Sequence, residues 1–331
     1  MHSGLDRTIN GVLLGCILVF LFNIPVSAQV SVGNQIPLPV IFELDPTYAQ
    51  FVSSNLCVRG DKHGISLVNL DTGEQLQQLL PDQSISVLKR NPHRFGEVLA
   101  GTWDGRLFRL VLKDNELELS EFDEIAHSEI MIPHQIMFHP EKTDRLILAD
   151  YRHLFLCTVK EGKIHIDNTL TPGDPDVMIA LVFPDNRSAD WFIVSAPQEK
   201  RYRGNWDTGK LVDITGKMLE YGYTVGKSGT SFLPRGDFDQ YLYINYMSAR
   251  PTSIIRHPSR PMTYYASTIG TAPLKISVDS RNFYTLEFLA SNRMLTFSVD
   301  VVPTDTDRLL ITTNKTVQFS TDAGATWNTI D

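Results

Sequence analysis

The sequence predicts an all-β fold, a β-propeller built from four-stranded blades, and three observations lead to it. Near the C-terminus, the segment from Ser320 to Trp327 matches every fixed position of the Asp-box pattern S-x-D-x-G-x-T-W, also called a BNR repeat. Apolar runs that end in proline recur at an interval close to the length of one blade. The segments between these prolines contain no long stretch with an apolar spacing of 3.6 residues, so few helices are expected.

The Asp-box is expected to form the turn between the third and fourth strands of a blade. Its Asp322 carboxylate can accept hydrogen bonds from nearby backbone N–H groups and close the turn. Gly324 can adopt the positive φ that a tight reversal requires. Ser320 and Thr326 complete the pattern, and the Trp327 ring folds back onto the blade. These residues predict a structural turn rather than a function, because Asp-boxes occur in enzymes and receptors alike.

Two weaker copies of the box lie upstream. The first keeps the acid, the glycine and an apolar residue at the tryptophan position, and the second keeps only the first half of the pattern. The first copy contains Asn69, Asp71, Gly73 and Leu76, and the second contains Asn205, Asp207 and Gly209. The repetition supports an architecture of several similar units.

Prolines at the ends of apolar runs mark the units. They are Pro46, Pro92, Pro140, Pro184, Pro234 and Pro303. The first five follow one another at intervals of 46, 48, 44 and 50 residues, which fits a four-stranded blade. Inside the third unit, three consecutive strands are expected at residues 135–138, 146–148 and 154–157.

The number of blades depends on the long interval before Pro303. It spans 69 residues, and a reduced blade is expected between Pro273 and Ser291, with strands at residues 274–278 and 283–289. Seven blades are predicted, with six blades or part of a larger propeller as alternatives. The outermost strand of the last blade should be short, since four residues follow Trp327, and residues 30–33 are a candidate to pair there.

The N-terminus has the features of a signal peptide. An apolar segment of 14 residues runs from Gly11 to Ile24, follows Arg7 and ends before Pro25. It is shorter than the roughly 20 residues that span a bilayer. We expect residues 1–28 to be removed before Gln29 and residues 29–331 to form a single propeller domain, secreted or in the lumen of the secretory pathway. An uncleaved signal anchor is the alternative.

The formal net charge of −8 disfavours nucleic acid and anionic membranes as partners. No later segment is long and apolar enough to predict a membrane span. Cys57 falls in the first unit and Cys157 on the third strand of the third, which disfavours a disulfide between them but leaves the state of both cysteines open. Asn186 and Asn314 begin glycosylation sequons in expected inter-strand turns.

A stretch of the third unit resembles the sortilin receptor family. The residues concerned are Ile132 to Pro140 followed by Thr143 to Leu148, together with the signal peptide and the complete Asp-box. The resemblance implies a ligand-binding propeller in the secretory lumen or outside the cell. Members of the family resemble a ten-bladed propeller followed by a cysteine-rich module, a membrane span and a cytoplasmic tail, and this chain departs from that pattern after the propeller.

A sialidase-like or other glycoside hydrolase is the alternative function, because Asp-boxes also occur in those enzymes. Arg90-Asn-Pro92 and Arg256-His-Pro258 have the spacing of the sialidase R-x-P motif, but not its place in the first blade. Asp174 and Asp176 are the most suggestive carboxylate pair. His165 and Asp167 share a face of an expected outer strand. No metal cluster, cofactor motif or catalytic triad is evident.

The sequence therefore predicts a non-catalytic binding module for a protein or peptide ligand. Two polar segments, residues 55–64 and 198–210, are expected to be loops of the kind that carry recognition on a rigid scaffold. The first of them includes the tripeptide Arg59-Gly60-Asp61, which is expected to lie in a turn. The second includes a basic run that begins at Lys200.

Overall fold

The computed structural model describes most of the chain between Pro46 and Ile330. The described residues are 46–122, 132–173, 178–184, 190–196, 201–214, 250–260, 263–269, 272–278, 284–289, 296–314 and 316–330. They contain 24 strands and no helix. The predicted signal peptide, residues 30–33 and Pro234 lie outside the described residues.

The first three sheets each contain four consecutive antiparallel strands. The first sheet has β1 (Tyr48–Phe51), β2 (Leu56–Asp61), β3 (Gly64–Asn69) and β4 (Gln75–Leu79). The second has β5 (Ile85–Arg90), β6 (Glu97–Thr102), β7 (Leu107–Lys113) and β8 (Glu116–Glu121). The third has β9 (Gln135–Phe138), β10 (Arg145–Ala149), β11 (Leu154–Lys160) and β12 (Lys163–Leu170).

The other three described sheets repeat this pattern. The fourth has β13 (Met178–Pro184), β14 (Asp190–Ala196), β15 (Arg201–Asn205) and β16 (Leu211–Asp213). The fifth has β17 (Arg250–Arg256), β18 (Thr263–Ile269), β19 (Leu274–Val278) and β20 (Tyr284–Phe288). The sixth has β21 (Thr296–Val301), β22 (Leu309–Thr313), β23 (Val317–Ser320) and β24 (Asn328–Ile330).

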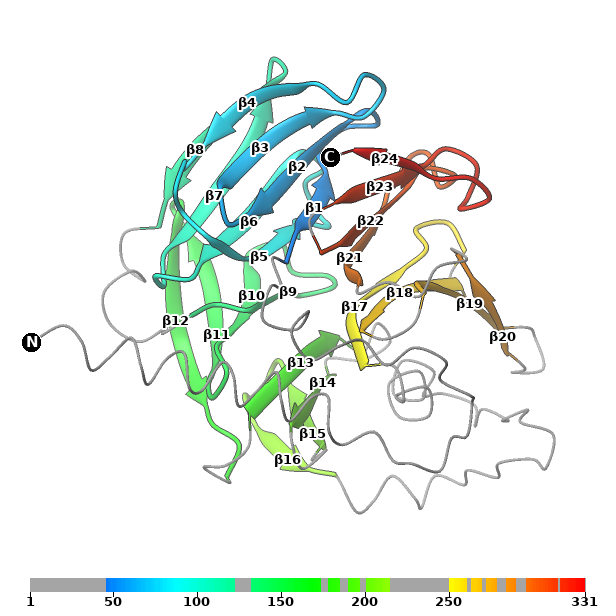
Figure 1. Cartoon of the computed structure of the whole chain (residues 1–331). Helices are drawn as coiled ribbons and strands as arrows, with labels where there is room; N and C mark the ends of the chain where they lie inside the picture. Colours follow the sequence, from blue (N-terminus) through cyan, green and yellow to red (C-terminus); the bar gives the residue numbers. More distant parts are fainter. Residues whose placement is uncertain are drawn as a thin grey trace, which may run out of the picture.

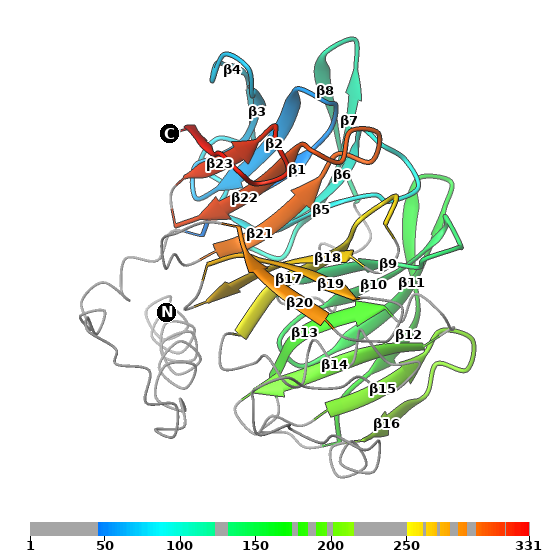
Figure 2. The same cartoon turned by 90° about the vertical axis from the view of Figure 1, so that its right-hand side faces the viewer.

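The sheets stand side by side around a common axis, as in a β-propeller (Figure 1; Figure 2). The first strand of each sheet is the innermost: β1, β5, β9 and β13 contact one another in turn, β17 contacts β21, and β21 contacts β1. The sixth sheet thus lies beside the first and closes the ring on that side (Figure 1). The predicted all-β propeller of four-stranded blades is confirmed.

Apolar side chains fill the spaces between adjacent sheets. Val58 and Phe108 belong to the cluster between the first and second sheets, and Met137 and Trp191 to the cluster between the third and fourth. Each sheet packs against neighbouring sheets, so its inner strands carry apolar side chains on both faces. Strand β6, for example, is buried along its whole length. The outermost strand β4 is mostly exposed. This gradient explains why the inner strands read as continuous apolar runs.

The predicted reduced blade between Pro273 and Ser291 is wrong. Its two expected strands are β19 and β20, which complete the fifth sheet beside β17 and β18. The error arose because the proline that follows the innermost strand of this sheet is Pro258, two residues after β17, and the predicted marks do not include it. Six blades lie among the described residues, and residues 215–249 lie outside them. The last strand, β24, has only three residues, as expected.

Most of the proline marks lie where the innermost strands end. Pro92 and Pro140 follow β5 and β9 within two residues, Pro184 ends β13, and Pro303 follows β21. Pro46 differs, because it precedes β1 and forms a bridge with Asn314. The regular first interval of 46 residues therefore does not join equivalent positions.

The first expected recognition loop is largely strand, and the described part of the second is half strand and half turn. Residues 56–61 form β2, and residues 201–205 form β15. Arg59, Gly60 and Asp61 end β2 instead of forming a turn, and Arg59 pairs with Asp61 at 3.1 Å. Their polar composition predicted loops, but polar side chains also occur on strands, where they face solvent or a neighbouring strand. Which strands pair cannot be deduced from the residue types alone.

Candidate functional site

One side of the ring is formed by turns of two kinds, and we call it the turn face. Because the strands are antiparallel, the turns between first and second strands lie at the same end of each sheet as those between third and fourth strands. The first kind includes residues 91–96, 139–144 and 302–308. The second kind includes residues 70–74, 206–210 and 321–327.

The segment from Ser320 to Trp327 forms the turn between β23 and β24, the third and fourth strands of its sheet. The Asp322 carboxylate accepts from the Thr326 backbone N–H at 2.8 Å and from the Thr326 hydroxyl at 2.6 Å. The Ser320 hydroxyl donates to the same carboxylate at 2.8 Å and accepts from the Gly324 N–H at 2.8 Å. These bonds, chiefly those from Thr326, lower the pKa of Asp322 to about 2.

Two residues of this turn explain its shape. Gly324 has a φ of 92°, and Ala323 beside it has a φ of 57°. The indole N–H of Trp327 donates to the Leu289 carbonyl of the fifth sheet at 2.6 Å. Its ring packs on the apolar cluster shared by the fifth and sixth sheets. The turn therefore joins two neighbouring sheets as well as two strands.

The turns at Asn69 and Asn205 occupy the equivalent position in the first and fourth sheets. In both, the asparagine side-chain oxygen accepts from the backbone N–H groups two and three residues later, at 2.9–3.3 Å. Gly73 and Gly209 have φ values of 74° and 59° and complete the turns. Asparagine thus caps these turns, whereas Asp322 shares that task with Ser320 in the last sheet.

The acids of these two turns bind neighbouring sheets. Asp207 pairs with Lys142 of the β9–β10 turn at 2.9 Å. Asp71 pairs with Arg308 of the β21–β22 turn at 3.5 Å, and Arg308 also donates to the Ser54 carbonyl at 2.6 Å. In each case a cation on a first turn meets an acid on a second turn of the next sheet. The pattern occurs at two junctions, between the third and fourth sheets and between the sixth and first.

The turns after the innermost strands are capped by the residue before the proline. Asn91 accepts through its side-chain oxygen from the His93 N–H at 2.9 Å. His139 and His257 accept through Nδ1 from backbone N–H groups two and three residues later, at 3.0–3.2 Å. Burial, the largest cause, lowers the pKa of both histidines. These histidines are therefore structural caps that favour the neutral form.

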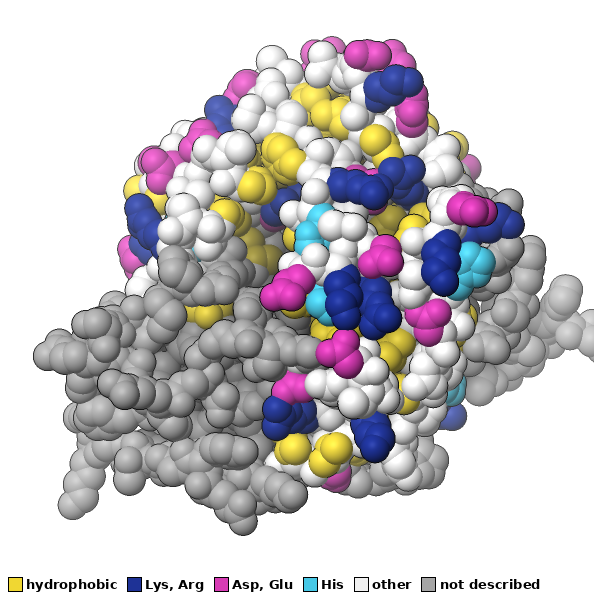
Figure 3. All heavy atoms as spheres, turned by 180° about the vertical axis from the view of Figure 1, so that it is seen from behind, with side chains coloured by type: hydrophobic (Ala, Val, Ile, Leu, Met, Phe, Trp, Pro, Cys, Tyr) yellow, Lys and Arg dark blue, Asp and Glu magenta, His cyan; other side chains and the backbone are white. Residues whose placement is uncertain are grey.

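Exposed charged and aromatic side chains stand on this fixed framework. The Arg94 side chain is 58% exposed, and Phe95 beside it is 41% exposed. The Arg90 guanidinium lies 5.5 Å from the centre of the Phe95 ring. Figure 3 shows basic, acidic and histidine side chains gathered together over one side of the molecule. These are the features of a surface that could recognise a polar ligand.

The candidate catalytic residues are dispersed or engaged elsewhere. Arg90 is paired with the chain's own Asp300 at 2.8 Å. Asp167 accepts from the Thr158 hydroxyl on the outer part of the third sheet, where His165 also lies. Asp174 and Asp176 lie outside the described residues, as does the side chain of Arg256. Within the described ranges, no three His, Cys, Asp or Glu side chains gather as a metal site would require.

The cysteines and one of the two sequons lie in the described part. Cys57 lies on β2 and Cys157 on β11, in the sheets where the sequence places them, and both thiols are free and buried. Burial raises the pKa of each thiol to about 12, so neither is reactive at neutral pH. Asn314 lies in the turn between β22 and β23. Asn186 lies outside the described residues.

Sequence reasoning missed several residues that join neighbouring sheets, two on the turn face and one at the axis. Lys142, Arg308 and Asp300 act across sheets, and no local pattern marks them. A weak signal exists for Asp300, because a charged residue stands between two valines in an innermost strand.

Comparisons with known proteins bear on the fold. No protein-family model matches the chain, and no curated protein matches it. Among solved structures, it is similar to the β-propeller domain of Cps50 (Swd1) from Myceliophteria thermophila, with a TM-score of 0.52 and 11% identity. The likeness covers 84% of this chain and 97% of that one. No helix among the described residues has the length and apolar character needed to cross a membrane. The comparison and the six sheets together identify the fold of this chain as a β-propeller.

Proposed function

We propose that the protein is a non-catalytic binding module that recognises a protein or peptide ligand through the turn face. The observation that carries the proposal is the combination of exposed side chains with fixed turns. Lys142, Asp207, Arg94 and Phe95 are exposed, while caps and cross-sheet contacts hold their turns. Binding residues on loops held by a rigid scaffold lose little entropy when a ligand arrives.

Phe95 and Arg94 are the proposed centre of recognition. Aromatic and arginine side chains supply most of the binding energy at protein interfaces. Phe95 is supported from below by Arg90, and Arg90 is itself fixed by Asp300. The ring is thus both accessible and held in place, which is the arrangement expected of an anchor residue.

The cellular setting belongs to the same proposal. The sequence features of a signal peptide, an Asp-box and a sortilin-like third unit support a secreted or luminal propeller. Glycosylation at Asn186 and Asn314 would fit that location. Detection of the glycans on protein purified from a secreting host tests this part, and an unprocessed N-terminus would count against it.

Selection from a displayed library of random peptides against the immobilised protein tests the binding role. Phe95→Ala and Arg94→Ala should each weaken selected peptides by at least tenfold while leaving the melting temperature unchanged. His63→Ala is the matched control, because His63 is exposed in the β2–β3 turn on the opposite side of the ring. Equal effects of all three changes, or a selection that yields no binders, would contradict the proposal.

A glycoside hydrolase is the competing proposal. Its sialidase-like form requires an arginine that is available to a substrate carboxylate, whereas Arg90 already binds Asp300 in two hydrogen bonds. Screening the purified protein against fluorogenic sialosides and common glycosides separates the two. Turnover that survives repurification and disappears when one acidic residue is changed would favour the enzyme.

A further inference from the structure

Among the described strands, the first and last sheets meet without exchanging a strand. All four strands of the sixth sheet come from one continuous stretch, β21 to β24, and all four of the first sheet from β1 to β4. The two sheets share an apolar cluster that includes Phe51, Val302 and Ile330. The bridge between Pro46 and Asn314 pairs backbone across this seam, and side chains supply further hydrogen bonds there.

The innermost strand β1 has a free backbone edge that faces the axis. The Val52 N–H donates to the Leu56 carbonyl of β2. Because backbone groups alternate in direction along an antiparallel strand, the N–H and C=O groups of Ala49 and Phe51 point away from β2. Such groups are costly when buried without partners. Both residues are buried, and hence their free N–H and C=O groups require hydrogen-bond partners from elsewhere.

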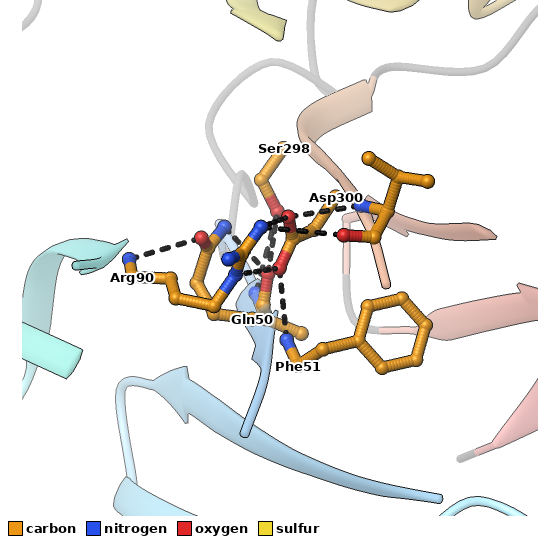
Figure 4. A network of polar contacts seen from close by, with 7 residues as sticks. Gln50, Phe51, Arg90, Ser298 and Asp300 are labelled. Atoms are coloured by element: carbon orange, nitrogen blue, oxygen red, sulfur yellow. Dashed lines mark hydrogen bonds and ion pairs between the residues drawn. The ribbon is translucent and has the colours of Figure 1, made fainter. Parts of the chain in front are cut away.

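Side chains of β21 supply these partners (Figure 4). The Ser298 hydroxyl accepts from the Ala49 N–H at 3.3 Å and lies 3.4 Å from the Ala49 carbonyl, to which it can donate. The Asp300 carboxylate accepts from the Phe51 N–H at 2.9 Å. Ser298 and Asp300 are two residues apart and so project from the same side of β21. They bond the edge of β1 much as the backbone of an added strand would.

A third residue locks this arrangement from the second sheet. Arg90 donates to Asp300 through Nη2 at 2.8 Å and Nε at 3.1 Å, and through Nη2 to the Val301 carbonyl at 3.2 Å. The Asp300 side chain is 2% exposed and that of Arg90 13% exposed. Burial alone would lower the pKa of Arg90, but the Asp300 carboxylate raises it. The pair therefore spans from the second sheet to the sixth, past β1.

The same use of side chains continues around the axis. Gln50 of β1 accepts from the Arg90 backbone N–H of β5 at 3.0 Å. Ser86 of β5 donates to the carbonyl of Pro133, just before β9. Side chains of β21, β1 and β5 are thus hydrogen-bonded to the backbone of the next innermost strand or of the segment just before it. At the seam between the sixth and first sheets, these side-chain hydrogen bonds include a buried ion pair, that of Arg90 with Asp300.

We propose that Ser298, Asp300 and Arg90 form a closure latch, a set of side chains that holds the first and sixth sheets together at the seam. Ser298 and Asp300 accept from the free N–H groups of Ala49 and Phe51, and Arg90 fixes Asp300 in the position that this requires. The latch predicts that loss of Asp300 opens the ring locally, at β1 and β21, before the other sheets loosen.

Hydrogen exchange resolved to single amides tests the latch on the full chain. In Asp300→Ala, the amides of Phe51 and of β21 should exchange at least tenfold faster than in the wild type, while those of the third sheet keep their rates. Arg90→Met should give the same local pattern, because it leaves the buried carboxylate without its cation. Asp300→Asn, which keeps an acceptor oxygen, should fall between Asp300→Ala and the wild type.

Two further variants keep the test decisive. Ser298→Ala leaves the ion pair intact and removes only the bonds to Ala49 and Thr312, so it should fold and accelerate Ala49 more than Phe51. Glu97→Gln is the matched control, since Glu97 pairs with Arg109 at 2.6 Å within the second sheet. Unchanged β1 amides in the latch variants, acceleration spread evenly over all sheets, or an equal effect of Glu97→Gln would overturn the proposal.

Discussion

Side chains bond the free edges of strands at the axis and also at the rim of the ring, and the two places differ in burial. At the rim, Gln77 of β4 accepts from the Leu117 N–H of β8 at 2.7 Å and donates to its carbonyl at 3.2 Å. At the axis, Asp300 of β21 bonds the Phe51 N–H. Gln77 is partly exposed, whereas the Asp300 side chain is almost fully buried.

The difference shows that hydrogen-bond geometry alone does not determine how much such a contact contributes to the free energy of unfolding. Water can replace the bonds of Gln77 when they break, so the net contribution of each is small. Water does not reach Asp300 as freely, and removal of one partner leaves the other charged and buried. We therefore expect the effect of a substitution to fall steadily from the axis to the surface.

The largest effect should come from Asp300→Ala. It leaves the Arg90 guanidinium buried without its carboxylate, which typically costs about 3–5 kcal/mol. Urea unfolding of the variant and of the wild type measures the change in the free energy of unfolding. A loss no larger than that of a surface substitution would mean that water already reaches the axis.

Trp327→Ala should come next. The ring packs on the cluster shared by the fifth and sixth sheets but is only partly buried, so a loss of about 2–4 kcal/mol is expected. Trp327→Phe keeps much of the apolar contact and loses the hydrogen bond to Leu289, and should cost less. Thermal unfolding of both variants checks the order, and the reverse order would show that the hydrogen bond outweighs the packing.

Acid should destabilise the protein through a partly buried histidine, His134. Burial lowers the pKa of His134 to about 4, below the ordinary value of 6.5. The folded state therefore binds fewer protons than the unfolded state between these values, and stability present above pH 6.5 is lost as the pH falls toward 4. The loss is at most about 3 kcal/mol. His134→Gln should flatten the pH dependence of the urea midpoint in this window, and an unchanged slope would exclude His134 as its cause.

Asp322 acts in a different pH window. Its pKa is lowered to about 2, so its contribution is present above about 3.8 and is lost as the pH falls below that value. The two windows allow the histidine and the carboxylate to be separated in one titration.

Gln77→Ala should have a modest effect. It removes two hydrogen bonds at the rim, and we expect a loss of about 1 kcal/mol. Gln77→Glu is the informative companion, because it keeps the acceptor for the Leu117 N–H and loses the donor to its carbonyl. Equal losses in Gln77→Ala and Asp300→Ala would refute the dependence on burial.

The smallest effect should come from Lys142→Ala. The ammonium and the Asp207 carboxylate are 45% and 57% exposed, and such pairs contribute at most about 1 kcal/mol. We expect a change in the melting temperature close to the error of measurement, and a smaller change still at high salt. A large loss would show that the turn face is more tightly coupled than exposure indicates.

Local patterns predicted the parts of this fold that are themselves local. The turn from Ser320 to Trp327 lies between a third and a fourth strand, and the strand expected at residues 135–138 is β9. The fifth sheet was misread because Pro234 fits the common interval, whereas the proline that follows β17, as Pro92 follows β5, is Pro258. Asp300 was missed because its partners, Phe51 and Arg90, lie 249 and 210 residues away along the chain. No window of sequence contains such a contact.

The distance between Asp300 and Phe51 has a consequence for the order of folding. Each sheet is a meander of neighbouring strands, so its contacts are short-range and can form early. The seam must wait until residue 300 has been synthesised, and until then the apolar side of the first sheet, with Phe51, Val68 and Leu70, has no covering partner. We expect this apolar surface to stay exposed in the nascent chain until the seam closes. Synthesis that stops before residue 300 should therefore release an open, aggregation-prone intermediate.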